Sequence, residues 1–270
     1  MSSTFSIDHI VIMVQNLDQA RQGFDDLGFT VLSGGTHAAN PTHNALISFK
    51  DGAYIEIIAL QPGKEDHPRS KRLDKWVAAS PGLVDFALLP THIEADIIAA
   101  RERGLDIEDA QDGGRLRPDG QAIQWQTANL GGSGLPFLCG DVTERRLRVP
   151  DGEAQHHKNG VTGVSNITIA VENLLTSAKY YEALLGIPPR PTPQNAALQA
   201  KTTTFSLNTV SITLAQPLAE ASPLQSYLKQ GERPYSFTLR SEHIQTDQEL
   251  PLSQASQAHI GLTSINPSKK

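Results

Sequence analysis

The sequence contains little that a secreted or membrane-spanning protein would need. It has one cysteine, Cys139, among 270 residues, so no intramolecular disulfide can form and nothing indicates an oxidising compartment. No run approaches the roughly 20 apolar residues of a membrane-spanning helix. The opening MSSTFSIDHI also lacks the basic and apolar segments of a signal peptide. A soluble, cytoplasmic protein is therefore the expectation.

Basic residues are also scarce. Lys and Arg number 23 against 29 Asp and Glu, which gives a formal net charge of -6. A nucleic-acid-binding domain is usually basic on one face, so this class is not expected. Hydrophobic residues make up 39% and charged residues 19% of the chain, as in folded globular proteins. The length allows one large domain or two of ordinary size.

What the sequence does contain is an internal repeat. The segment IDHIVIMVQNLDQARQGFDDLGFTV begins as a strand, continues as a helix that Asn16 can cap, and stops at Gly28. THNALISF and GAYIEIIAL follow as two further strands. Later in the chain, GVSNITIAVENLLTSAKYYEALLGI matches the first segment almost position for position, with Asn166 in the place of His9. TVSITLAQP likewise mirrors YIEIIALQP.

Two fainter copies complete the pattern, and the last of them is truncated. One such unit would leave a sheet face uncovered, so the units are expected to pair. The sequence therefore predicts an α+β fold of tandem βαβββ units that pair with one another. The alternative is a generic α+β protein with chance similarity. The four units cover residues 5–62, 82–142, 161–217 and 233–265, and the two predicted halves are residues 1–150 and 151–270.

These segments resemble a known family. DHIVIMVQNLDQARQGFDDLGFTV, THNALISF, YIEIIALQP and GLPFLCGDVTERRLRVP are similar to the glyoxalase-like domain branch of the vicinal oxygen chelate superfamily. That superfamily includes lyases, isomerases, ring-cleaving dioxygenases and metal-free drug-binding proteins. The resemblance implies that the paired units form curved, cup-shaped mixed sheets with helices outside. It is specific for the fold but not for the reaction.

The resemblance implies a metal site in the first unit. In metal-binding members, a His on the first strand and a Glu on the last strand of a unit bind a divalent ion, and His9 and Glu56 occupy these positions. Glu56 also lies within an apolar strand, where a carboxylate needs a partner. When the second unit is aligned with the first, Asp85 corresponds to His9, and Cys139 lies within about one residue of the position of Glu56. Asp85 is a candidate third ligand, whereas Cys139 is typical of a small buried apolar residue.

Such a ligand set suits Zn, Mn, Fe or Ni better than copper. The alternative is a hydrogen-bonded pair of His9 and Glu56 without an ion. In the third unit, Asn166 and Ser211 stand at the matching positions, and neither is a good metal ligand. The second cup is therefore expected to bind no metal.

Further histidines have competing interpretations. His43, at the start of a predicted strand, is a candidate general base because its pKa lies near the working pH. Alternatively, it ties a loop down through side-chain to backbone bonds. His37 lies at the edge of that loop and is expected to be exposed. His156 and His157 lie in the connector between the halves and are expected to be solvated.

The expected function is a metal-dependent enzyme of the lyase, isomerase or dioxygenase type, acting on a small oxygenated substrate in the N-terminal cup. The ion would stabilise an enolate-like charge while His43 moves a proton. The alternative is a metal-free protein that sequesters a small hydrophobic or aromatic compound. A small molecule is the expected partner, without nucleic acid or membrane, and a homodimer remains open. Arg115 and Arg117 either clamp an anionic substrate or belong to a surface turn.

Overall fold

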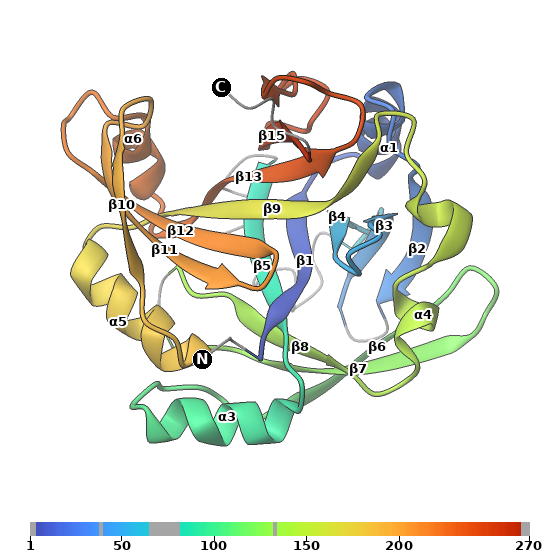
Figure 1. The fold of residues 1–270 in the computed structure, drawn as a ribbon. Helices are drawn as coiled ribbons and strands as arrows, with labels where there is room; N and C mark the ends of the chain where they lie inside the picture. Colours follow the sequence, from blue (N-terminus) through green and yellow to red (C-terminus); the bar gives the residue numbers. More distant parts are fainter. Residues whose placement is uncertain (1–3, 38–39, 65–81, 132–133, 266–270) are drawn as a thin grey trace.

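The computed structural model describes residues 4–37, 40–64, 82–131 and 134–265. Within them, two β-sheets pack face to face and most helices lie outside (Figure 1). The strands of the first sheet are β1 (Ser6–Met13), β2 (Leu32–His37), β3 (Thr42–Ser48), β4 (Tyr54–Leu60), β5 (Gly82–Leu89), β6 (Gln111–Leu116), β7 (Ala122–Ala128) and β8 (Phe137–Asp141).

The first sheet closes into a barrel. Its strand order among the described residues is β1-β4-β3-β2-β6-β7-β8-β5. β1 is parallel to β4, β5 is parallel to β8, and the antiparallel contact between β1 and β5 joins the two βαβββ units. Contacts between β2 and β6 close the ring. The helices of this half are α1 (Leu17–Asp26), α3 (Ile93–Glu102) and α4 (Arg145–Arg148), and the 3-10 helix η1 (Gly152–Gln155) follows.

The second sheet is open and seven-stranded in the described residues, in the order β10-β11-β12-β9-β13-β15-β14. The third unit is complete, whereas the last unit has only three strands and no helix between them in the part of the chain that is described. The predicted fold class is confirmed. The elements are β9 (Val161–Ala170), α5 (Leu174–Leu185), β10 (Arg190–Asn195), β11 (Ala200–Leu207), β12 (Val210–Pro217), α6 (Pro223–Leu228), β13 (Arg233–Ser241), β14 (Gln248–Glu249) and β15 (His259–Ser264).

The repeated asparagines cap the repeated helices. The Asn16 side chain accepts a hydrogen bond from the backbone of Gln19, and Asn173 does the same at the start of α5. Each satisfies one of the N–H groups that a helix start leaves unpaired. Gly28 and Gly186 follow the helices at φ angles of +86° and +66°, which glycine adopts without strain. No helix in the described ranges is long and apolar enough to cross a membrane.

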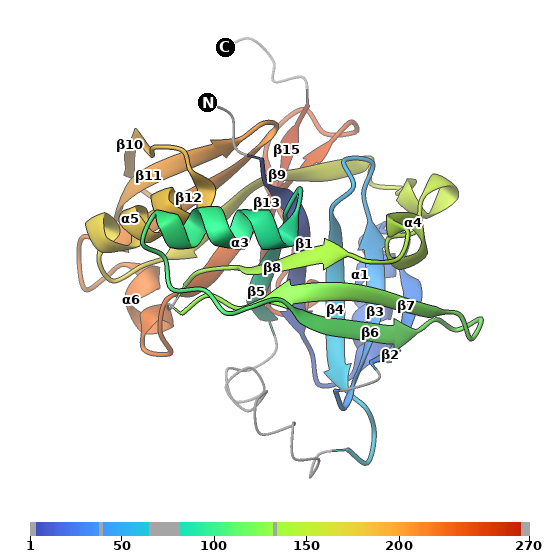
Figure 2. The same cartoon turned by 90° about the horizontal axis from the view of Figure 1, so that it is seen from below.

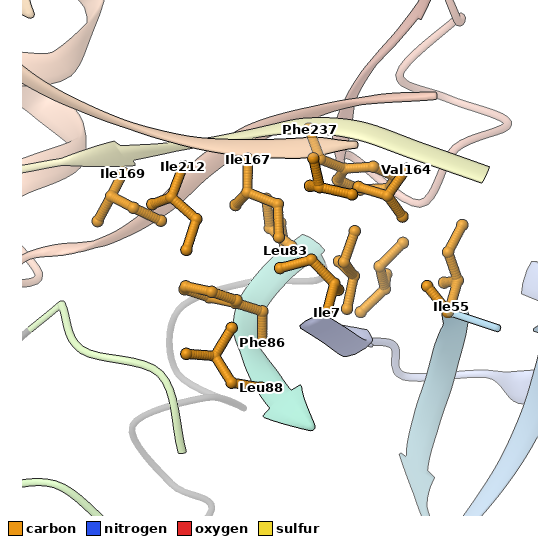
Figure 3. Packing of buried hydrophobic residues seen from close by; sticks show 14 of the residues in the cluster. Ile7, Ile55, Leu83, Phe86, Leu88, Val164, Ile167, Ile169, Ile212 and Phe237 are labelled. Carbon is orange, nitrogen blue, oxygen red and sulfur yellow. The ribbon is translucent and has the colours of Figure 1, made fainter. Parts of the chain in front are cut away.

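The barrel turns its apolar side outward and shares a core with the second sheet. Side chains of β1 and β5, including Ile7 and Phe86, face Ile167 and Phe237 across the interface (Figure 3). One cluster of buried residues runs through both sheets. The two halves share this buried cluster. The predicted boundary at residue 150 remains a prediction. This packing frees the inside of the barrel for polar groups.

The strand register corrects one part of the match between the two halves. In the barrel, His9 lies opposite Tyr54 across the β1–β4 contact, whereas in the second sheet Asn166 lies opposite Ser211. Ser211 therefore stands at the level of Tyr54. The sequence match that placed Ser211 on Glu56 is therefore wrong in space by two residues. A shift of two residues keeps the same side chains on the same face, so the hydrophobic pattern does not reveal it.

His157 is buried at the joint between the halves, contrary to the prediction of a solvated connector. The backbone N–H of Thr30 donates to its Nδ1 at 3.0 Å, and its Nε2 lies 3.0 Å from the carbonyl oxygen of Ser48. The ring must therefore carry its proton on Nε2 and be neutral. Burial lowers the pKa of His157. His156, by contrast, has a side chain that is 59% exposed.

We expect His157 to make the fold sensitive to mild acid. Below about pH 6.5, the ordinary histidine pKa, the unfolded chain binds a proton that the folded His157 does not accept. The free energy of unfolding should then fall, by at most about 1.4 kcal/mol per pH unit for one group. His157→Gln retains a donor and an acceptor but does not titrate, so its urea-unfolding free energy should depend less on pH in this range.

The matched control is His156→Gln, which changes the exposed neighbour and should keep the pH dependence of the wild type. Equal slopes in the wild type and both variants would contradict a neutral, buried His157.

Candidate active site

The barrel encloses a cavity of about 560 Å³. Strands β6, β7 and β8 run across β3 and β4 of the opposite wall (Figure 2). The lining combines imidazoles, carboxylates, amides and aromatic rings contributed by strands of both units. A cavity of this size suits a small molecule.

A β-bulge explains why Asp8 and His9 stand side by side in a buried strand. The register between β1 and β5 shifts between Ile7 and His9, and Ile7 and Ile10 both face the outer core although they are three residues apart. The extra residue turns the His9 side chain into the barrel. Asp8 and His9 are 0% and 4% exposed.

Asp8 is held by two arginines. Arg148 donates from Nη1 and Nη2 to the two carboxylate oxygens, at 2.8 and 2.6 Å, and Arg145 adds a contact at 3.1 Å. Burial on its own would raise the pKa of Asp8, but the charge and hydrogen bonds of Arg148 hold it well below the usual range. Asp8 is therefore ionised and anchors the site.

Sequence reasoning missed this anchor. Arg145 and Arg148 lie on the short helix α4. Both also donate to the carboxylate of Asp141, at the end of β8, with nitrogen–oxygen distances of 2.9 and 2.6 Å. Arg145 further donates to the carbonyl oxygen of Gly52 at 2.6 Å. The sequence signal in CGDVTERRLR was a local one: Arg145 and Arg148 are three residues apart on one helical turn, and Asp141 ends the strand just before it. The partner Asp8 lies some 140 residues away, and no local pattern could identify it.

His9 has a fixed tautomer and orientation. Its Nδ1 lies 3.0 Å from the Asp8 carboxylate, so the proton is on Nδ1, and Nε2 faces Glu56 at 3.6 Å. The ring stacks on Tyr54 with 4.8 Å between centroids, and Phe137 packs edge-on at 5.3 Å.

Glu56 receives three groups from other strands of its own unit, β1, β2 and β3. Asn44 donates to Oε1 at 2.5 Å, and Nε2 of His37 lies 3.5 Å from the same oxygen. Burial would raise the pKa of Glu56, but the hydrogen bonds and charges of His37, His9 and Asn44 lower it to about 2. His37 was predicted to be exposed, which is wrong: its side chain is 10% exposed, and its Nδ1 bonds Thr42 Oγ1 at 2.7 Å.

Asn44 fits closely over the glycine pair of β2. A Cβ at Gly34 would collide with the Asn44 side chain, so the GGTH segment needs a glycine there. The Asn44 Oδ1 atom is buried without a hydrogen-bond partner among the described residues. The Asn44 amide therefore donates to Glu56 through its nitrogen, while its oxygen accepts no hydrogen bond from the described residues.

Two of the predicted site residues lie elsewhere. His43 sits between Thr42 and Asn44, both of which line the cavity, so its side chain points to the opposite face of β3. Burial lowers its pKa. Asp85 does not line the cavity either, and its carboxylate accepts a hydrogen bond from the Phe86 backbone at 2.8 Å. Their catalytic and metal-binding roles remain predictions.

The model of the glyoxalase-like domain family matches residues 7–185. This chain belongs to that family. The predicted resemblance to glyoxalase-like domains is confirmed. A search of curated proteins found no match to the glyoxalase-like protein.

Solved structures share the fold of the glyoxalase-like protein at low sequence identity. A hypothetical protein from Staphylococcus aureus has a TM-score of 0.74 and 12% identity, covering 97% of this chain and 100% of that one. A mutant of 4-hydroxymandelate synthase from Streptomyces coelicolor has a TM-score of 0.64 and 14% identity, covering 100% and 95%. At such identities the likeness shows the fold alone.

One group of three candidate ligand atoms in the described residues lies within 4.8 Å of one another: Asp8, His9 and Cys139. In the glyoxalase-like protein this group suits a cation poorly. Two guanidinium groups, from Arg145 and Arg148, already neutralise Asp8. Burial raises the pKa of Cys139 far above its usual range, so the thiol keeps its proton as long as no cation is bound.

The C-terminal half of the glyoxalase-like protein has an uncharged network at the corresponding place. The Asn166 oxygen accepts from Ser211 at 2.9 Å and from Thr213 at 2.8 Å, and its amide donates to Thr168 at 2.9 Å. Both lone pairs of that oxygen are used. The absence of metal from this cup remains a prediction, and the chemistry of these four side chains supports it.

Asp8→Asn should destabilise the protein strongly. The change leaves Arg148 buried without its main counter-charge, and breaking a buried ion pair in this way costs about 3–5 kcal/mol. Urea unfolding near neutral pH measures the loss. Arg148→Met should cost a comparable amount, and the double variant should cost less than the sum of both, because it removes both charges.

Arg146→Ala is the control from the same helix. Its partner is Glu144, and both side chains are about two-thirds exposed, so the expected change is below about 1 kcal/mol. If Asp8→Asn were as mild as Arg146→Ala, the anchoring role of Asp8 would be disproved.

Proposed function

We propose that the barrel cavity is the active site of a divalent-metal-dependent enzyme that acts on a small oxygenated substrate. The observation that carries the proposal is the buried, ionised carboxylate of Glu56, faced by Nε2 of two imidazoles. His9 approaches one carboxylate oxygen at 3.6 Å and His37 approaches the other at 3.5 Å. Both distances exceed those of ordinary N–H···O hydrogen bonds.

The tautomer of His9 supports a cation between these groups. Because Asp8 holds the proton on Nδ1, the Nε2 atom of a neutral His9 directs a lone pair at an ionised oxygen of Glu56. Two electron-rich atoms face each other there, and a cation between them would relieve the repulsion, as would a second proton on His9. A histidine that binds a metal through one ring nitrogen usually donates the N–H of the other ring nitrogen to a carboxylate, as His9 does to Asp8.

Glu56, His9 and His37 would hold the ion. Two imidazoles and one carboxylate suit Zn, Mn, Fe or Ni and leave positions for substrate oxygens. When bound, such an ion acts as a Lewis acid that stabilises an enolate-like charge, as lyase, isomerase and dioxygenase reactions of this kind require. The two histidines contact different oxygens of Glu56, so the three groups lie less close together than the Asp8, His9 and Cys139 group.

The remaining polar residues of the cavity orient these ligands. Asp8 fixes the tautomer of His9, and Asn44 holds Glu56 through the hydrogen bond to Oε1. The Tyr54 hydroxyl accepts from Arg148 at 3.0 Å, and burial raises its pKa, so the phenol stays neutral beneath the His9 ring. The proposal assigns no proton transfer to His43, because its side chain lies on the far face of β3.

Elemental analysis of the purified protein tests the proposal. We expect about one divalent ion per chain in the wild type and none in His9→Ala, His37→Ala or Glu56→Gln. Cys139→Ser and Asn166→Ala are the controls and should keep the ion, since the first belongs to the rival ligand group and the second to the C-terminal cup. Metal should raise stability by about 2.7 kcal/mol at a hundredfold excess over the dissociation constant.

Two results would overturn it. A protein that purifies without metal and gains no thermal stability from Zn, Mn, Fe or Ni salts would favour a protonated His9 paired with Glu56, in a metal-free binding protein. Retention of metal in Glu56→Gln together with its loss in Cys139→Ser would assign the ion to the other group.

A further inference from the structure

Arg115 is a buried arginine that faces the same cavity. It lies on β6 directly opposite His37 of β2, its side chain lines the cavity, and it is 4% exposed. Neighbouring Arg117 is different, because it pairs with Asp119 near the protein surface.

Arg115 has no carboxylate partner in the described ranges. Its Nη1 donates to the carbonyl oxygen of Gly34 and its Nη2 to that of Arg148, at 3.2 Å. Both acceptors are uncharged. Arg148, which is equally buried, has two carboxylates instead. A buried charge without a counter-charge is costly, and burial does lower the pKa of Arg115.

The guanidinium of Arg115 keeps N–H donors that an anion in the cavity could use. A guanidinium has five N–H donors, and these two hydrogen bonds leave others available. Glu56 is the nearby carboxylate that acts on Arg115 electrostatically, but it is committed to Asn44 and the two histidines. Asp8 and Asp141 are paired with Arg145 and Arg148. Glu108 and Asp112 also line the cavity, at exposed positions where the amides of Asn129 and Gln126 donate to them.

We propose that Arg115 binds a carboxylate of the substrate, which makes the substrate of this site a small oxygenated carboxylic acid. The inference rests on the proposed function for the location of the reacting oxygens, whereas the carboxylate contact belongs to Arg115. The planar fork of the guanidinium matches a carboxylate through two parallel hydrogen bonds. Register places Arg115 beside His37, so one small molecule can reach both.

Pyruvate and its neutral amide, pyruvamide, are the probes. Thermal unfolding and calorimetric titration of the full chain should show binding of pyruvate but not of pyruvamide at matched ionic strength. Arg115→Gln should weaken pyruvate binding by about tenfold or more, as expected for loss of a charged hydrogen-bond partner. Arg115→Lys keeps the charge without the fork and should give an intermediate loss. Arg117→Gln, two residues along the same strand and turn, should bind as the wild type does.

The titrations are run with Mn-loaded and with chelator-treated protein. Pyruvate binding that survives chelation and is lost in Arg115→Gln would establish the anion site even if the metal proposal fails. Pyruvate binding that disappears on chelation but is unchanged in Arg115→Gln and Arg115→Lys would place the carboxylate on the metal and overturn the inference. Equal responses of the wild type to pyruvate and pyruvamide would also overturn it. In that case Arg115 only ties β2 to the end of α4, a role visible as lost stability in Arg115→Gln.

Discussion

The ion pair between Asp8 and Arg148 supports the organisation of the whole barrel interior. It joins β1, near the start of the chain, to α4, at the end of the first half. It also supplies the carboxylate that sets the proton position on His9. A bidentate contact between fully buried groups is strong only while both partners are present. The site therefore depends on a helix of one turn, Arg145–Arg148, that contributes no proposed ligand.

The second sheet has a different role. Its residues, such as Ile167 and Phe237, cover the apolar outer face of β1 and β5, so the barrel wall is buried on the outside by hydrocarbon and filled on the inside by polar groups. In the second half, Asn166 and its hydroxyl partners satisfy one another without any charge. One copy of the repeated unit thus retains reactive side chains, while the other supplies packing and a closed hydrogen-bond network.

Local pattern was enough to predict the fold. The strand alternation, the capping asparagines and the terminal glycines act within a few residues, and the duplication made each unit a check on the other. The pairing of His9 with Glu56 could also be predicted, because both lie on adjacent strands of one unit. Arg148 could not, since its partner is far away in sequence. His37 was judged exposed because burial of a loop edge depends on the second unit, and the two-residue slip at Ser211 leaves no trace in the hydrophobic pattern.

The bulge at Asp8 has a consequence for the whole of β1. Side chains along a strand alternate between two faces, so one additional residue exchanges the faces of everything beyond it. Upstream of the bulge Ile7 belongs to the outer core, and downstream Ile10 and Ile12 do so as well, while Val11 and Met13 line the inside. The extra residue therefore sets the phase of the strand. A regular strand through the same residues would direct Ile10 and Ile12 into the cavity and turn His9 toward the hydrocarbon interface, so this one extra residue decides the polarity of both surfaces.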